Sequence, residues 1–147
     1  MLVSEIMFPD PACCQPDTPL RDVVKLMLEN DCGAIPVCDR GRVVGIITDR
    51  DIACRAFSRP ASPLAMPVRE VMTSAVLTIQ ESDSIESAIQ IMEAEQVRRL
   101  PVMRGTNLVG MLSLGDLAEH IPERKTGELV REISRSPRHA SRMAAKH

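Results

Sequence analysis

The sequence predicts an α+β fold made of two β-α-β-β-α units related by a pseudo-two-fold axis. The first observation is an internal repeat, because the chain shifted by 65 residues matches itself without a gap over residues 3–53. Eleven of these 51 aligned positions are identical, against about three expected by chance at ordinary residue frequencies. The second observation is that each copy has an apolar stripe with helical spacing, followed by two short strand patterns. Two copies favour a paired arrangement, since a solenoid needs at least three repeats.

The first helix of each repeat is predicted from a capping signal and the apolar stripe. In the first repeat, Thr18 caps the helix, Pro19 occupies its first position and Gly33 ends it. In the second repeat, Asp83 or Ser84 is the cap. The two apolar stripes are Leu20, Val23, Val24, Met27 and Leu28, and Ile85, Ala88, Ile89 and Met92.

Two short strands and a second helix complete each repeat. In the first copy we expect strands over residues 34–38 and 42–48, joined by a hairpin turn at residues 39–42. Residues 104–107 form the matching turn in the second copy. The second helices begin near residues 49–51 and near residues 115–116.

The predicted domain organisation follows from the repeat and from the charge distribution. The first repeat covers residues 1–59, a proline-rich linker covers residues 60–66, and the second repeat covers residues 67–122. Residues 123–147 are a basic tail with seven Lys or Arg and three Asp or Glu, which we expect to be partly helical or disordered. A short helix is predicted within the tail at residues 128–134.

The composition indicates a globular protein with an aliphatic core. The 147 residues include no Trp, no Tyr and only two Phe, yet 44% are apolar and 26% are charged. No apolar run approaches the roughly 20 residues of a membrane span, and the N-terminus lacks a signal-peptide pattern. We therefore expect a cytoplasmic protein without membrane contact. The scarcity of aromatic rings argues against nucleic-acid binding that stacks bases on side chains.

The five cysteines favour reduced, partly buried thiols. No CxxC pair occurs and the three His lie late in the chain, so no metal site is expected. The adjacent Cys13 and Cys14 leave a thiol redox function open as an alternative. On a strand these neighbours point to opposite faces, which favours the structural interpretation.

Two pairs of motifs indicate the family. Strand starts with an x-Pro-Val pattern occur at Ile35-Pro36-Val37 and at Leu100-Pro101-Val102. Residues 45–51 and 110–116 then share the order Gly, two apolar residues, Thr or Ser, two further residues and Asp. Over about residues 3–120 the chain resembles a tandem pair of cystathionine-β-synthase (CBS) domains, the Bateman module.

The resemblance implies a regulatory role. It implies sheets that pack against each other with helices outside, and clefts between the repeats that bind an adenosine-containing ligand. The candidates are AMP, ADP, ATP, NAD and S-adenosylmethionine, with no required cofactor and no catalytic residue. The resemblance further implies a homodimer that signals to an unidentified partner protein. The alternatives are a thiol redox protein and nucleic-acid binding through the basic tail.

The two Gly-centred motifs supply the central candidate residues. By resemblance, Thr48 and Ser113 contact phosphate, while Asp51 and Asp116 accept hydrogen bonds from ribose hydroxyls. Hydrogen bonds to such a charged acceptor contribute about 1.5–3 kcal/mol each. The same spacing is also that of a plain helix cap followed by a first-turn acid, and this alternative stays open.

The remaining candidates make the two sites unequal in charge. Arg98 and Arg99 stand where the family often carries a basic residue that faces phosphate, and Gly33 and Ala34 occupy the equivalent positions. Arg50 adds a cation in the first repeat. A solvated arginine pair is the alternative interpretation of Arg98 and Arg99. By family position the adenine pocket is lined by Ala34, Ile35, Leu77, Thr78 and Leu100, each of which also fits a plain core position.

Overall fold

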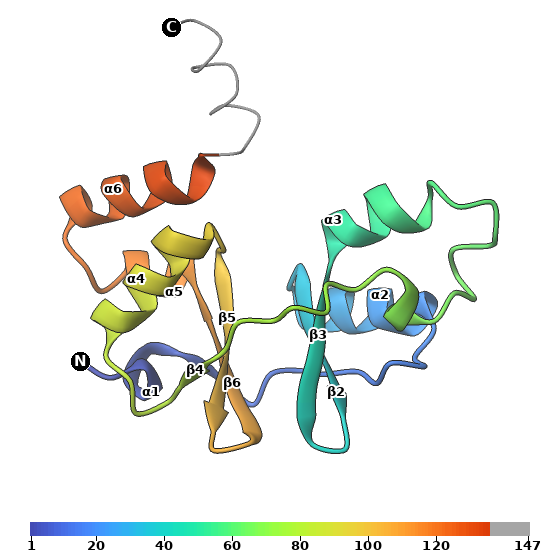
Figure 1. Cartoon of the computed structure of the whole chain (residues 1–147), viewed down its shortest axis with the longest axis horizontal. Helices are drawn as coiled ribbons and strands as arrows, with labels where there is room; N and C mark the ends of the chain where they lie inside the picture. The colour runs from blue at the N-terminus through green and yellow to red at the C-terminus, as the bar shows by residue number, and fades with distance from the viewer. Residues whose placement is uncertain (136–147) are drawn as a thin grey trace, which may run out of the picture. The chain divides into compact units, whose positions relative to one another are not determined.

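The computed structural model describes residues 1–135 and confirms the mixed α+β class (Figure 1). The chain forms two compact units. Unit 1 contains Met1–Pro9, Thr78–Arg104 and the described residues from Val109 onward, and unit 2 contains Asp10–Leu77 with Gly105–Leu108. Each structural unit therefore combines most of one sequence repeat with the first residues of the other repeat.

Unit 1 is built on a four-stranded sheet with strand order β1-β6-β5-β4. The short β1 pairs antiparallel with β6, and β4 pairs parallel with β5. The strands are β1 (Phe8–Pro9), β4 (Ile79–Gln80), β5 (Arg99–Arg104) and β6 (Asn107–Ser113). The helices are α1 (Val3–Ile6), α4 (Ile85–Glu95), α5 (Leu114–Ala118) and α6 (Glu123–Ser134).

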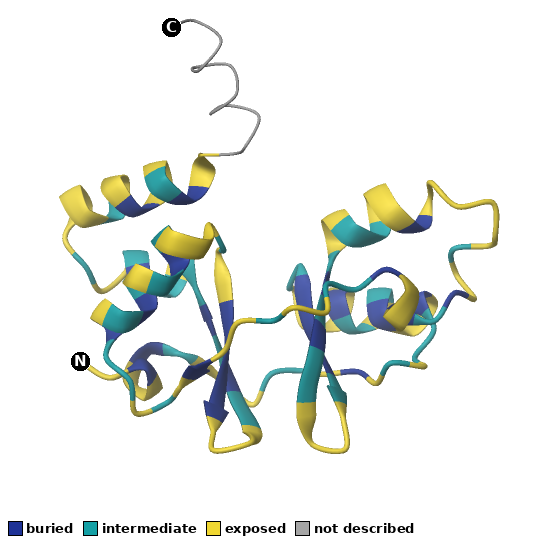
Figure 2. Cartoon of the chain, viewed as in Figure 1, coloured by how far each residue is buried: buried dark blue, intermediate teal, exposed yellow. Residues whose placement is uncertain are grey.

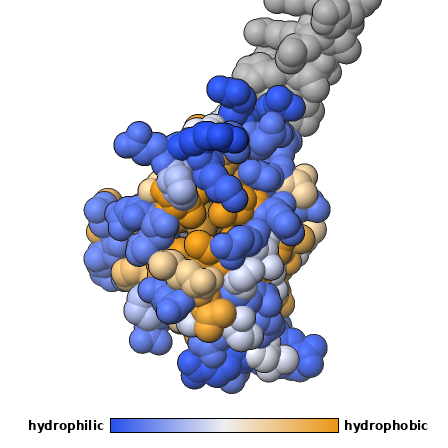
Figure 3. All heavy atoms as spheres, turned by 90° about the vertical axis from the view of Figure 1, so that its left-hand side faces the viewer, coloured by the Kyte–Doolittle hydropathy of each residue, from blue (hydrophilic) through white to orange (hydrophobic). Residues whose placement is uncertain are grey.

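The core of unit 1 is aliphatic, as the composition requires. Met92, Leu100 and Leu112 are fully buried in one cluster. Helix α6 packs against α4 and α5, and buries Leu129 and Ile133 in the same cluster. Figure 3 shows that apolar side chains also gather on an outer face of unit 1, surrounded by hydrophilic ones. Helix α6 contains the short helix predicted at residues 128–134 but begins earlier, at Glu123.

Unit 2 has the same plan with shorter sheet pairing. Its hairpin joins β2 (Ala34–Asp39) to β3 (Arg42–Thr48), as predicted. The turn residues Arg40 and Gly41 have φ angles of 52° and 79°, a pair of left-handed positions that suits a tight hairpin turn. The helical segments are α2 (Leu20–Glu29), α3 (Asp49–Asp51), the π-helix η1 (Ile52–Ala56) and the 3-10 helix η2 (Val68–Glu70).

Three expectations about α2 are wrong, namely Thr18 as its cap, Pro19 as its first residue and Gly33 as its end. Pro19 in an extended conformation is the N-cap, and no side chain caps this helix. Thr18 instead accepts a hydrogen bond from the Gln15 N–H at 3.0 Å. The helix ends at Glu29 rather than at Gly33, because Asp31 already adopts a left-handed φ of 46°. In the second repeat Ser84 is the cap, as predicted, and accepts from the Ser87 N–H at 3.2 Å.

The two sequence repeats exchange short segments near their starts. In unit 1, β1 pairs Phe8 with Met111 of β6. In unit 2, an isolated antiparallel bridge joins Thr73 to Ile46 of β3, and these two residues are the 65-residue equivalents of Phe8 and Met111. A segment near the start of each sequence repeat thus pairs with the sheet of the other repeat.

The exchanged segments explain a glycine in each unit. A Cβ on Gly110 would lie 2.5 Å from the Met7 sulfur and 3.0 Å from the Phe8 carbonyl oxygen. A Cβ on Gly45 would meet the Met72 sulfur and the Thr73 carbonyl oxygen at the same distances. Glycine is therefore required at both positions for close backbone approach. Figure 2 shows buried and exposed residues alternating around the helices of each unit.

Candidate functional site

The two Gly-centred motifs form the same structure, a strand end that passes directly into a helix. Thr48 is the N-cap of α3, and its Oγ1 accepts from the Asp51 N–H at 3.1 Å. The Thr48 N–H donates to Asp51 Oδ2 at 3.0 Å. In unit 1 the Ser113 N–H donates to Asp116 Oδ2 at 2.8 Å, and Ser113 Oγ accepts from the Asp116 N–H at 3.1 Å. Each motif is therefore a reciprocal capping box.

The caps leave different parts of the two carboxylates free. Ser113 Oγ also donates to Asp116 Oδ2 at 2.8 Å, so one oxygen of Asp116 takes every cap contact. Within residues 1–135, Asp116 Oδ1 accepts no hydrogen bond. Asp51 Oδ1 lies 3.7 Å from Arg55 Nε, and the side chain is only 13% exposed. The position equivalent to Arg55 is His120, whose Nδ1 pairs with the Asp116 carbonyl oxygen at 2.9 Å.

The predicted cations lie close to these junctions. The Leu114 N–H donates to the Arg98 carbonyl oxygen at 2.8 Å, so the residues that precede β5 adjoin the start of α5. Arg98 and Arg99 are exposed and form no ion pair with another described residue. The equivalent bond in unit 2 runs from the Asp49 N–H to the Gly33 carbonyl oxygen at 3.0 Å. Arg50 is exposed beside it.

The predicted adenine-lining residues fall into two groups. Ala34, Ile35 and Leu100 are 7%, 1% and 0% exposed and belong to the buried core. Leu77 and Thr78 are exposed. Ala34 pairs with Thr48 in the β2–β3 register, so unit 2 places a candidate wall residue beside a candidate phosphate contact.

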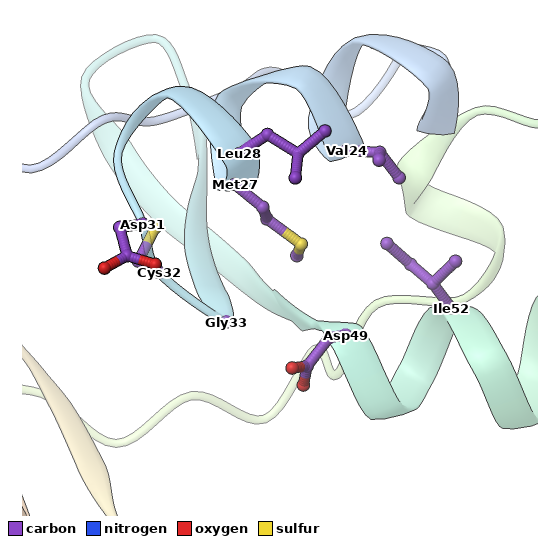
Figure 4. Close-up of a pocket in the computed structure, with 8 residues that line it drawn as sticks. All are labelled: Val24, Met27, Leu28, Asp31, Cys32, Gly33, Asp49 and Ile52. Carbon is purple, nitrogen blue, oxygen red and sulfur yellow. The ribbon is translucent and has the colours of Figure 1, made fainter.

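Unit 2 also contains a pocket that the sequence interpretation missed. Its volume is about 460 Å³, and it lies between the C-terminal half of α2 and the start of α3 and η1 (Figure 4). Met27, Leu28 and Ile52 supply apolar walls, while Asp31 and Asp49 add two carboxylates. The sequence signal for this pocket was the predicted apolar stripe of α2. Leu28 belongs to that stripe, but its side chain is 77% exposed and is not covered by the core. Val24, Cys32 and Gly33 complete the lining.

The thiol environment disfavours redox chemistry at Cys14. Burial raises the pKa of the Cys14 thiol to about 12, and the neighbouring Cys13 and Cys38 add to the shift. A thiolate is the reactive form in such chemistry, and a pKa this high keeps the Cys14 thiol protonated at neutral pH. Cys13 is exposed while Cys14 is buried, as expected for neighbours on opposite faces of a strand.

Three other expectations concern metal, membrane and the basic tail. Within residues 1–135, no three His, Cys, Asp or Glu side chains form a group able to hold a metal ion. No helix in that range is long and apolar enough to cross a bilayer. The tail is described as far as Arg135, and its helix α6 holds Arg124 paired with Glu128 at 3.2 Å. The more basic remainder, residues 136–147, lies outside the described part.

Comparisons with known proteins agree with the geometry. The family model described as "CBS domain" matches residues 3–56 and 68–123. The CBS domain-containing protein YhcV of Bacillus subtilis is 35% identical over 133 residues, which cover 90% of this chain and 94% of that protein. Hypoxic response protein 1 of Mycobacterium tuberculosis is 32% identical over 130 residues, covering 88% and 91%.

Two solved structures show the same fold. The crystal structure of Hypoxic Response Protein I with two coordinated zinc ions matches with a TM-score of 0.75 at 31% identity, covering 83% of this chain and all of that one. The structure of CBSX2 in complex with AMP matches with a TM-score of 0.69 at 25% identity, covering 80% and 93%. From its two family matches, its repeated capping boxes and these similarities, we conclude that this chain belongs to the CBS domain family, as a tandem pair or Bateman module.

Proposed function

We propose that this protein is a regulatory module that binds an adenosine-containing nucleotide and transmits its presence to a partner protein. The observation that carries the proposal is the repeated junction at which a hydroxyl and a carboxylate meet at a strand end. The complex of the related CBSX2 with AMP supports a nucleotide of this class. The candidates are AMP, ADP, ATP, NAD and S-adenosylmethionine.

In this proposal Asp116 and Asp51 bind the ribose. A ribose presents two neighbouring hydroxyl donors, and a carboxylate has more acceptor positions than the cap uses. Asp116 retains Oδ1 for this purpose, since the cap contacts converge on Oδ2. Asp51 shares its Oδ1 with Arg55, so ribose binding there must displace or rearrange that ion pair.

Phosphate recognition then distinguishes the two repeats. Arg98 and Arg99 carry charge at positions where unit 2 has Gly33 and Ala34. Ser113 and Thr48 supply hydroxyls, and Arg50 supplies the cation of unit 2. Charge-assisted bonds to phosphate are roughly twice as strong as neutral ones. We therefore propose that the residues of unit 1 contribute more to nucleotide affinity than those of unit 2.

The same proposal includes the nonpolar wall and the assembly state. The exposed Leu77 and Thr78 are proposed to hold the adenine by nonpolar contact, since the chain has almost no aromatic ring for stacking, whereas the buried Ala34, Ile35 and Leu100 would support this wall from the core. A homodimer is proposed because the pocket of unit 2 exposes Leu28 to solvent. Sedimentation velocity at several concentrations measures the assembly state, and a monomer at all of them contradicts it.

A ligand panel tests the proposal directly. Thermal unfolding is measured with each of the five nucleotides, and at 100 times its dissociation constant the true ligand adds about 2.7 kcal/mol. Adenine and ribose 5-phosphate alone serve as controls for the two halves of the ligand. An unchanged melting temperature with all five nucleotides contradicts nucleotide binding.

The assignment of residues needs variants that retain the caps. Asp116→Asn and Asp51→Asn keep an oxygen for the cap while they remove the charge, whereas alanine would also lose the cap. We expect calorimetry to show nucleotide affinity about tenfold weaker or more for Asp116→Asn. Arg98→Gln with Arg99→Gln should weaken ATP more than adenosine. Unchanged affinities in all these variants contradict the assignment but not binding itself.

A further inference from the structure

Three of the five cysteines meet at one strand pairing of unit 2. Cys14 forms an isolated parallel bridge with Val37 of β2. The Cys14 N–H donates to the Pro36 carbonyl oxygen at 3.1 Å, and the Cys38 N–H donates to the Cys14 carbonyl oxygen at 2.8 Å. The segment around Cys14 is therefore held along β2, with Cys13 and Cys38 directly beside the bridge.

The bridge separates these three thiols into two sets. Cys14 and Val37 are 6% and 0% exposed, so both side chains point into the core. Alternation along a strand turns the neighbouring side chains to the other face. Cys13 is exposed and Cys38 is half-buried, so this register places both side chains on the face away from the core. In the pairing of β2 with β3, a register shift lies between Val37 and Cys38.

From this geometry we infer that Cys13 and Cys38 form a reversible disulfide when a peroxide oxidises the protein, whereas Cys14 stays reduced. The exposed Cys13 thiolate attacks hydrogen peroxide, which yields a Cys13 sulfenic acid and hydroxide. The Cys38 thiol then displaces the sulfenic oxygen as water, and the S–S bond forms. In sum, two thiols and one peroxide become one disulfide and two waters.

The surroundings select this pair over the other cysteines. Cys14 is the chain neighbour of Cys13, but its thiol lies in the core on the opposite face. Burial, followed by the neighbouring Cys13, raises the pKa of the Cys38 thiol to about 11, so Cys38 is a poor first nucleophile at neutral pH. Cys32 lines the pocket beside α2, and Cys54 is exposed on η1. These two thiols serve as internal controls.

The disulfide would act on unit 2 alone. It would connect the segment before α2 to the strand after it, and so close a loop that contains the whole helix. The equivalent positions in the second repeat are Thr78 and Met103, which cannot form such a bond. The inference does not depend on nucleotide binding, because both thiols would react in the free protein.

Peroxide oxidation of the full chain tests the inference. Reduced protein is treated with hydrogen peroxide, remaining thiols are alkylated, and the intact mass and linked peptides are measured before and after dithiothreitol. Trypsin leaves Cys13 with Cys14 in residues 1–21, and Cys32 with Cys38 in residues 26–40. Single substitutions and fragment spectra therefore assign the link.

The expected results differ between variants. Wild type, Cys54→Ser and Cys32→Ser should lose two free thiols and form the 13–38 link, with a melting temperature that rises by about 5 °C or more and falls back on reduction. Cys13→Ser and Cys38→Ser should form no intramolecular disulfide, and their reduced forms should melt close to reduced wild type. A Cys13–Cys14 link, disulfides only between chains, or oxidation of Cys13 without loss of the Cys38 thiol would each overturn the inference.

Discussion

Unit 1 and unit 2 share one plan but differ in how their helices are covered. In unit 1, α6 lies on α4 and α5 and buries Leu129 and Ile133 in the core. In unit 2, α2 and the α3–η1 segment border an open pocket, and Leu28 is 77% exposed where the equivalent position in α4 is Glu93. The duplicated sequence has therefore kept its sheet and its capping boxes, while its outer helical surfaces have diverged.

The two units also carry different chemical groups. Unit 1 carries the arginine pair and a carboxylate oxygen left open by its cap. Unit 2 carries the exposed apolar pocket and the cluster of thiols. Under the proposals above, an anionic ligand binds at the first set of residues, whereas apolar association and oxidation take place at the second.

The largest effect on stability is expected when a buried side chain of α6 is shortened. Leu129→Ala removes a fully buried side chain from the unit 1 core and should lower the free energy of unfolding by about 2–5 kcal/mol. Leu28→Ala in unit 2 is the matched control, and should change it by less than about 0.5 kcal/mol because the side chain is exposed. Urea unfolding followed by circular dichroism measures both. Equal midpoints for the two variants would show that α6 does not complete the unit 1 core.

A second, smaller effect tests the feature that the units share. Gly110→Ala and Gly45→Ala each place a methyl group against a methionine sulfur and a backbone oxygen, and should cost about 1–3 kcal/mol. Gly127→Ala in α6 is the control, since its added carbon meets nothing within 4 Å and helix propensity favours alanine by about 0.5–1 kcal/mol. Thermal unfolding should show a lower melting temperature for the first two variants and a higher one for Gly127→Ala. If alanine is tolerated at only one of the two glycines, the exchanged segments do not approach the two sheets equally closely.

The capping boxes should give a third effect of about 0.5–2 kcal/mol per cap. Ser113→Ala should cost more than Thr48→Ala, because Ser113 Oγ also donates to Asp116 whereas Thr48 has no such bond to Asp51. Thr48→Ser and Ser113→Thr keep the hydroxyl and serve as controls. Chemical denaturation of the four variants measures the order, and a larger loss for Thr48→Ala would contradict this account.

The smallest effect concerns an ion pair that only unit 1 has. The Arg104 guanidinium hydrogen-bonds to Glu81 and lowers the pKa of that carboxyl, while the equivalent positions in unit 2 are Pro16 and Asp39. Since the folded-state pKa is depressed, the stabilisation is present above the unfolded-state pKa and is lost as the pH falls through the folded-state pKa. Both groups are at the surface, so the effect is small and screened by salt.

Melting temperatures of wild type and Glu81→Gln as a function of pH measure this ion pair. The two curves should differ slightly near neutral pH and converge at acid pH. A difference that grows as the pH falls would have the wrong sign and would contradict the assigned contact.

Much of the local structure could be predicted from single stretches of sequence. The β2–β3 hairpin follows from two apolar runs around Arg40-Gly41, and α4 from Ser84 with its apolar stripe. The start and end of α2 were predicted wrongly, because Thr18 bonds to Gln15 and a left-handed Asp31 follows the helix. Cap signals are short, and several nearby residues can satisfy them.

The candidate site could be predicted only in part. The motif residues Thr48, Asp51, Ser113 and Asp116 do converge at strand-to-helix junctions, but a capping box alone explains their spacing equally well. The sequence could not show that the cap uses mainly one oxygen of Asp116, or that Arg55 approaches the other oxygen of Asp51. Such details depend on side-chain geometry in three dimensions.

The sequence by itself determined the duplication, the aliphatic core, the hairpins and the paired motifs, because these depend on local periodicity and composition. Only the tertiary structure decided that Phe8 pairs with Met111 and Thr73 with Ile46, and that Cys14 is bridged to Val37 and buried while Cys13 stays exposed. It also decided that α6 covers one set of helices while the equivalent set borders a pocket. The physical reason is that these pairings join distant residues through very short segments, whose choice of partner depends on burial and backbone hydrogen bonds that no local pattern records.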